Sequence, residues 1–126
     1  VRENASLAYY IFSRLEKFKG LMVISSGIDA DKREKAEEII LRQVKEISEG
    51  NISDYEFDST LKSIETGINS LNDSQLQVVD FYLSQSITGG SDTLHSLTEK
   101  VMKVRKKDVA EVASRIKLDT VYFLTP

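Results

Sequence analysis

Histidine, cysteine and acidic side chains often carry catalysis or bind metals, but here they form no catalytic pattern. The 126-residue chain contains one histidine, His95, and no cysteine. Without cysteine, a thiol nucleophile, a disulfide and a Cys-ligated zinc site are excluded. A zinc site needs three or four protein ligands, and no HxxEH or HxxxH motif occurs. We therefore expect no metal site and no complete enzyme in this chain, with His95 on a solvated helix face.

Two other patterns are also better explained without chemistry. Gly89-Gly90 lacks the Gly-Lys-Ser/Thr of a phosphate loop and follows no predicted strand, so we interpret it as a helix break. Acidic residues such as Glu37, Glu38 and Glu46 fall on predicted polar helix faces beside lysine and arginine, which indicates a solvated surface rather than an acid/base pair.

Charge and hydropathy restrict the classes of partner that we expect this chain to bind. The net charge of −3 argues against nucleic acid, and no aromatic residue interleaves the basic run from Lys100 to Lys107, which we interpret as a charged surface. No apolar run reaches the roughly 18 residues that span a bilayer. We expect a cytoplasmic protein that binds neither nucleic acid nor membrane.

Periodicity predicts an α/β (α+β) fold in which helices pack on a mixed or antiparallel sheet. Alternating aromatic and β-branched residues predict strands near both ends of the chain, and apolar stripes at helical spacing predict five helical segments between them. The expected strands are 7–15, 21–26 and 120–124, and the helical segments lie within 29–47, 53–71, 72–87, 94–104 and 106–116.

Local signals place the helix ends. Ser53 with Glu56 has the spacing of a capping box, and so has Asp31 with Glu34, although Asp29 could cap that helix instead. Asn72 or Asp73 is expected to cap the third helix, and Gly50 is expected to end the first.

The length fits one domain, residues 1–126. Three strands are few for so much helix, and the chain begins at Val1. We therefore expect a domain truncated at its N-terminus, with further sheet strands supplied by a preceding segment.

The first fifteen residues, VRENASLAYYIFSRL, carry a resemblance. Arg2, then Leu7-Ala8-Tyr9, then Ile11-Phe12-Ser13 resembles the later, non-zinc half of the pitrilysin (insulinase) family of zinc metallopeptidases, which includes processing peptidases. The likeness continues in order through Phe18-Lys19-Gly20-Leu21, Gly27-Ile28-Asp29, Ser53-Asp54-Tyr55-Glu56, Lys107-Asp108-Val109 and 118–124, and so covers nearly the whole chain.

The resemblance implies a C-terminal, substrate-side domain whose zinc, ligands and general base lie in a separate domain or subunit. By position, it makes Arg2 and Tyr9 the candidate substrate-binding residues, since guanidinium and phenol groups can donate hydrogen bonds to a peptide carbonyl. The plainer alternative is that Tyr9 packs at a strand end and Arg2 pairs on the surface. Tyr10 is expected in the core, on one face with Phe12.

Two functions follow from the resemblance, and the sequence does not separate them. The parent is either a zinc metallopeptidase, in which this domain positions a peptide or unfolded polypeptide, or a non-catalytic relative that binds a peptide or partner subunit. Ala5 and Ser6 depart from the family pattern, in which Leu or Gln and then Gly are common. The resemblance therefore does not determine the loop geometry before the strand. A third hypothesis, which does not depend on the resemblance, is a stand-alone interaction domain with an unrelated fold. An exposed strand edge would also permit self-association.

Overall fold

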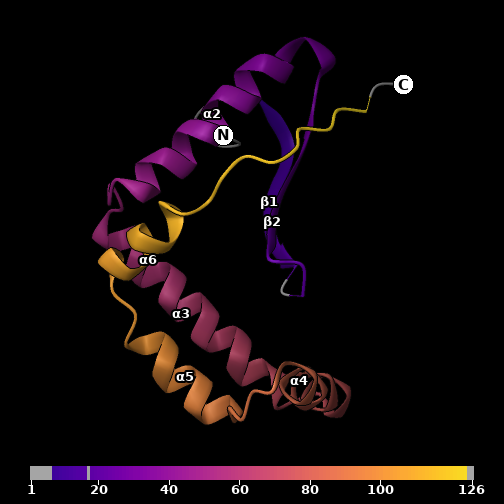
Figure 1. Cartoon of the computed structure of the whole chain (residues 1–126), viewed down its shortest axis with the longest axis vertical. Helices are drawn as coiled ribbons and strands as arrows, with labels where there is room; N and C mark the ends of the chain where they lie inside the picture. The colour runs from indigo at the N-terminus through magenta and orange to yellow at the C-terminus, as the bar shows by residue number, and fades with distance from the viewer. Residues whose placement is uncertain (1–6, 17, 125–126) are drawn as a thin grey trace.

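The computed structural model describes residues 7–16 and 18–124, which fold into a β-hairpin followed by helices. Figure 1 shows an arc, with the hairpin and α2 at one end and α4 at the other. The helices are η1 (Ala30–Lys32), α2 (Arg33–Ser48), α3 (Asp54–Leu71), α4 (Gln75–Thr88), α5 (Leu94–Met102) and α6 (Lys106–Ala113). The predicted α+β class is confirmed. None of the described helices is long and apolar enough to cross a membrane.

The hairpin joins β1 (Ala8–Glu16) to β2 (Leu21–Ile28) as an antiparallel pair. Its turn uses Gly20 at a φ of 63°, a left-handed conformation that favours glycine. Ala8 pairs with Ile28, and Tyr10 pairs with Gly27. Between these two pairs β1 therefore contains one residue more than β2. The extra residue of this β-bulge is Tyr9.

Tyr10 and Phe12 share one face of the hairpin, as predicted, with their ring centroids 6.0 Å apart. The expectation that Tyr10 is a core residue is wrong, because 51% of it is exposed. Its ring instead covers Gly27, where an added Cβ would lie 2.4 Å from Tyr10 Cε1. Among the described residues no helix packs closely enough on this face to bury the two rings.

The helix ends follow their local signals in part. Ser53 and Glu56 form the predicted capping box, and Gly50 adopts a φ of 81° directly after Glu49, the C-cap of α2. At α4, however, the cap is Ser74 rather than Asn72 or Asp73.

The predicted Asp31–Glu34 capping box does not form. A 3-10 turn occupies 30–32, and α2 begins after Lys32 without a side-chain cap. Asp29, the alternative cap, also makes no cap bond, because its carboxylate binds Lys32 and Tyr9 instead.

The predicted closing strand is wrong: residues 120–124 form no strand in the structure, and α6 ends at Ala113 rather than near Ile116. A strand needs a neighbour with which to form its hydrogen-bond ladder. Within the described ranges the sheet consists of β1 and β2 alone. The closing segment returns to the start of α2, where the guanidinium of Arg33 lies 5.1 Å from the ring centroid of Phe123.

The core lies among the helices, where α2 packs on α6 and α3 packs on α5. The buried apolar residues are all helical: Ala36, Ile39, Ile68, Leu94 and Ala113. Lys106, at the start of α6, donates to Ile52 O at 2.8 Å and to Asp54 Oδ1 at 2.5 Å, which ties α6 to the start of α3.

The molecule exposes more surface than a compact protein of its size. Its accessible surface is 9896 Å², against roughly 6,800 Å² for a compact chain of this mass. The excess includes apolar side chains on the hairpin and on α4.

Candidate substrate- or partner-binding site

Tyr9 is held at the bulge of the hairpin with 70% of its surface exposed. A bulge leaves the extra residue outside the regular pairing and redirects its side chain. The phenol reaches across the end of β2, where Tyr9 Oη donates a hydrogen bond of 2.6 Å to Asp29 Oδ1. The other carboxylate oxygen of Asp29 accepts a bond of 2.7 Å from Lys32 Nζ. Tyr9, Asp29 and Lys32 therefore form one continuous polar triad.

Asp29 and Lys32 are site residues that the sequence analysis did not assign. Asp29 was considered only as a helix cap and as part of the Gly27-Ile28-Asp29 resemblance, and Lys32 was given no site role. The signal that could have found them is the hairpin itself. Antiparallel pairing of Ala8 with Ile28 makes Tyr9 and Asp29 diagonal neighbours across the end of the hairpin, where their side chains form a hydrogen bond.

The triad fixes the protonation of its members. The hydrogen bond to Asp29, and then the negative charge of Asp29, raise the pKa of Tyr9 above its usual value. The bonds from Lys32 and then from Tyr9 lower the pKa of Asp29, and the bond to Asp29 raises the pKa of Lys32. At neutral pH the site therefore holds a neutral phenol, an ionised carboxylate and a charged amine.

This protonation limits what Tyr9 can do. A phenol has one hydroxyl proton, and here it is donated to Asp29. The phenol oxygen can still accept a hydrogen bond from a ligand N–H, and the exposed ring can pack on a ligand. Donation to a developing oxyanion would require Tyr9 to leave Asp29.

β1 also exposes two aromatic rings that follow Tyr9 in the sequence. Tyr10 and Phe12 are each about half exposed. Ser26 Oγ donates a hydrogen bond of 3.1 Å to Tyr10 O and braces the strand pair beside the bulge. The outer edges of β1 and β2 pair with no other described strand.

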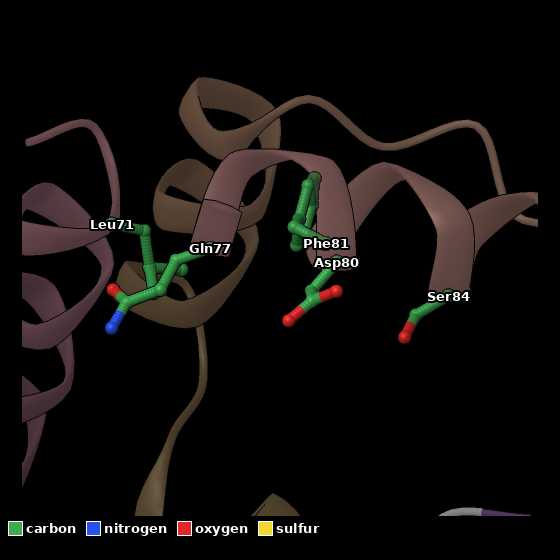
Figure 2. A pocket seen from close by; sticks show the side chains of 5 residues that line it. All are labelled: Leu71, Gln77, Asp80, Phe81 and Ser84. Atoms are coloured by element: carbon green, nitrogen blue, oxygen red, sulfur yellow. The ribbon is translucent and has the colours of Figure 1, made fainter. Parts of the chain in front are cut away.

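A separate shallow hollow of about 250 Å³ lies along α4. Figure 2 shows Asp80 and Ser84 projecting to the same side of the helix, with Leu71 and Gln77 at the other end of the hollow. Its lining contains the carboxylate of Asp80 but no histidine or lysine that could act as a general base toward Ser84. The hollow therefore lacks the serine–histidine or serine–lysine pair that activates a serine nucleophile.

Comparison with known proteins identifies the family. A family profile described as the peptidase M16 inactive domain matches residues 1–64, which include both strands and α2. The chain belongs to the peptidase M16 family. The expected resemblance to the non-zinc half of pitrilysin-like peptidases is therefore confirmed, and the chain is an inactive-type domain of this family.

A curated relative and a solved structure agree with this assignment. The chain is 33% identical over 124 residues to the "Probable inactive metalloprotease YmfF" of Bacillus subtilis (strain 168), and it spans 29% of that protein's length. The fold is similar to part of the crystal structure of a conserved protein from Enterococcus faecalis V583, with a TM-score of 0.83 and 23% sequence identity. The similarity covers 90% of this chain and 27% of that protein.

Peptidases of the M16 family imply zinc in the parent protein, but the residues described in this domain do not fit the metal. Among them, no group of three or more histidine, cysteine, aspartate or glutamate side chains could hold an ion. His95 Nε2 lies 3.5 Å from Glu99 Oε1, and the histidine side chain is 85% exposed on α5, as expected for a solvated face.

Arg2 and the basic run from Lys100 to Lys107 are the predicted residues that remain. Arg2 lies outside the described residues, so its predicted role stays a prediction. In the basic run, Lys100 pairs with Asp92, Arg105 with Asp108 and Lys106 with Asp54. These ion pairs offset much of the positive charge and agree with a charged surface.

Proposed function

We propose that this chain is a binding domain of a non-catalytic M16-type protein, and that its hairpin contacts an extended peptide or partner segment. The observation that carries the proposal is the hydrogen bond from Tyr9 to Asp29. Stabilising an oxyanion requires donors aimed at the charge that develops in the transition state. Tyr9 instead donates inward, and Lys32 holds its acceptor in place.

The rest of the hairpin suits binding. An extended peptide can add to an unpaired strand edge through main-chain hydrogen bonds, while side-chain surfaces give selectivity. Here Tyr9 would accept from a peptide N–H, and the rings of Tyr10 and Phe12 would pack against apolar side chains. The name of the Bacillus subtilis relative, a probable inactive metalloprotease, supports the same choice.

The alternative function is substrate positioning in an active zinc metallopeptidase. Under that alternative Tyr9 would exchange Asp29 for the substrate carbonyl and would act with Arg2. The zinc site would lie in another domain or subunit.

Metal content separates the two functions. The full-length protein would be purified without chelator and its zinc measured before and after zinc is added back, alongside hydrolysis of internally quenched peptides. We expect no bound zinc and no hydrolysis, with binding of the same peptides retained. One zinc per chain together with peptide hydrolysis would establish the metallopeptidase instead.

The role of Tyr9 is tested by binding. We expect Tyr9→Ala in the full-length protein to weaken peptide binding about tenfold, because both the ring and the acceptor are lost. Tyr55→Ala, at an 81% exposed tyrosine on α3, serves as the matched control. Fluorescence anisotropy with labelled peptides measures the affinities, and unchanged binding by Tyr9→Ala would rule out the hairpin site.

A further inference from the structure

A groove of about 430 Å³ lies where α2, α3, α5 and α6 meet. Its floor and walls are mainly apolar and include Ile47, Phe57, Leu61, Ile64 and Val104. No residue of β1 or β2 lines it, so it is separate from the hairpin site.

The groove is preformed by contacts on each side. The α3–α5 and α2–α6 pairs build its walls. Lys106 links the two pairs through Ile52 O and Asp54. Despite this framework, Ile64 remains 42% exposed and Ile47 38% exposed. The groove therefore presents apolar side chains to solvent in a fixed arrangement.

The charge of the groove is negative. Glu46 and Glu56 are the charged residues of its lining. Glu46 Oε2 accepts a bond of 2.7 Å from Asn51 Nδ2, and Glu56 Oε2 accepts from Ser53 N at 3.0 Å. These contacts orient both carboxylates without neutralising them. The lining therefore carries two carboxylates and no cationic side chain, while Lys106 lies beside it, paired with Asp54.

We propose that this groove binds a basic amphipathic segment of another polypeptide. A large aliphatic or aromatic side chain would occupy the apolar floor, and an adjacent lysine or arginine would lie beside Glu46 and Glu56. The half-exposed walls suit a side chain carried on a passing chain, because small-molecule pockets usually enclose most of their ligand. Complementary charge would then select basic partners over acidic ones. This site goes beyond the proposed hairpin function and uses different residues.

The test uses the full-length protein and fluorescein-labelled peptides of twelve residues. One peptide combines leucine with lysine, a second replaces lysine by glutamate, and a third replaces leucine by serine. We expect saturable binding of the leucine–lysine peptide and at least tenfold weaker binding of the other two. Equal binding of the glutamate peptide, or of the serine peptide, would overturn the proposal.

Variants locate the binding. We expect Ile64→Lys to weaken binding at least tenfold, whereas Leu76→Lys, at a 71% exposed position on α4, leaves it unchanged. Glu46→Gln should weaken binding about threefold at low salt, and this difference should fade near 0.5 M salt because ions screen the carboxylate. The matched control is Glu99→Gln on α5.

Two results would count against the groove even if the peptide binds. Equal loss in Ile64→Lys and Leu76→Lys would mean that the peptide binds elsewhere. Light scattering on the same samples would detect a dimer, and a dimer abolished by Ile64→Lys would mean that a second copy covers the groove. Circular dichroism would confirm that each variant is folded.

Discussion

The hairpin and the helices of this M16 domain are held together in different ways. Every buried apolar residue of the described structure belongs to a helix, whereas the hairpin has none and exposes Tyr10 and Phe12. The hairpin depends on its backbone ladder and on the Tyr9–Asp29–Lys32 triad. A two-stranded ribbon is marginally stable by itself in water. The helices therefore hold the buried apolar side chains that stabilise the fold, while the hairpin leaves aromatic side chains exposed to solvent.

The largest expected effect tests where the stability lies. We expect Ile39→Ala, at a 6% exposed position in α2, to lower the free energy of unfolding by about 2–4 kcal/mol, because it removes buried methyl groups and leaves a cavity. Phe12→Ala in the hairpin should cost about 1 kcal/mol or less, because half of the ring already contacts water. Urea denaturation followed by circular dichroism measures both. Equal decreases in the free energy of unfolding of the two variants would contradict the conclusion that the helices carry more of the stability than the hairpin.

Two glycines should respond with opposite sign. Gly20 has a φ of 63°, so Gly20→Ala should destabilise the hairpin by about 1 kcal/mol. Gly67 lies inside α3 with open space where a Cβ would stand, so Gly67→Ala should stabilise by up to about 1 kcal/mol. Thermal unfolding of the two variants gives the signs directly. A destabilised Gly67→Ala would indicate close contacts at this face of α3.

Helix caps give a smaller effect within the helical region. Ser53→Ala removes one half of a complete capping box and should cost about 1 kcal/mol. Ser74→Ala should cost only a few tenths of a kcal/mol, since its cap bond to Gln77 N is long, at 3.5 Å. The urea midpoints rank the two variants, and a larger loss in Ser74→Ala would reverse the expected order.

The smallest effect concerns the triad and is seen in titration rather than stability. The pKa of Asp29 is lowered first by Lys32 and then by Tyr9. We expect Lys32→Met to raise the pKa of Asp29 more than Tyr9→Phe does, as measured by NMR titration of the carboxyl carbon. What ionised Asp29 adds to the free energy of unfolding should be present above the ordinary aspartate pKa and be lost as pH falls through the lowered pKa of Asp29. What protonated Tyr9 adds should be present below the ordinary tyrosine pKa and be lost as pH rises through the raised pKa of Tyr9.

Local signals predicted the elements that local interactions determine. The Ser53–Glu56 capping box, the Gly50 helix end and the hairpin each need only a few neighbouring residues, and the structure contains all three. The closing strand at 120–124 failed because its alternation describes a strand but supplies no pairing partner. The exposure of Tyr10 was missed for a related reason, since burial depends on what packs over the hairpin.

The candidate site was predictable only in part. The resemblance pointed to Tyr9, and the structure adds the bulge that redirects its side chain. Asp29 was missed because its partner Tyr9 is twenty residues away, and only a correct strand register brings the two together. Lys32 was missed with it, because its role depends on Asp29. Arg2 lies outside the described residues, and its partnership with Tyr9 stays a prediction.

The link from Lys106 to Asp54 also bears on how the chain folds. The two residues are 52 positions apart, whereas the hairpin and the caps of α3 join near neighbours. Closing a long loop costs more conformational entropy than closing a short one, so distant contacts form late. We therefore expect α6 to dock last during folding and to detach first in partial unfolding. Hydrogen exchange at the α6 amides, faster than at those of α3, would reveal that order.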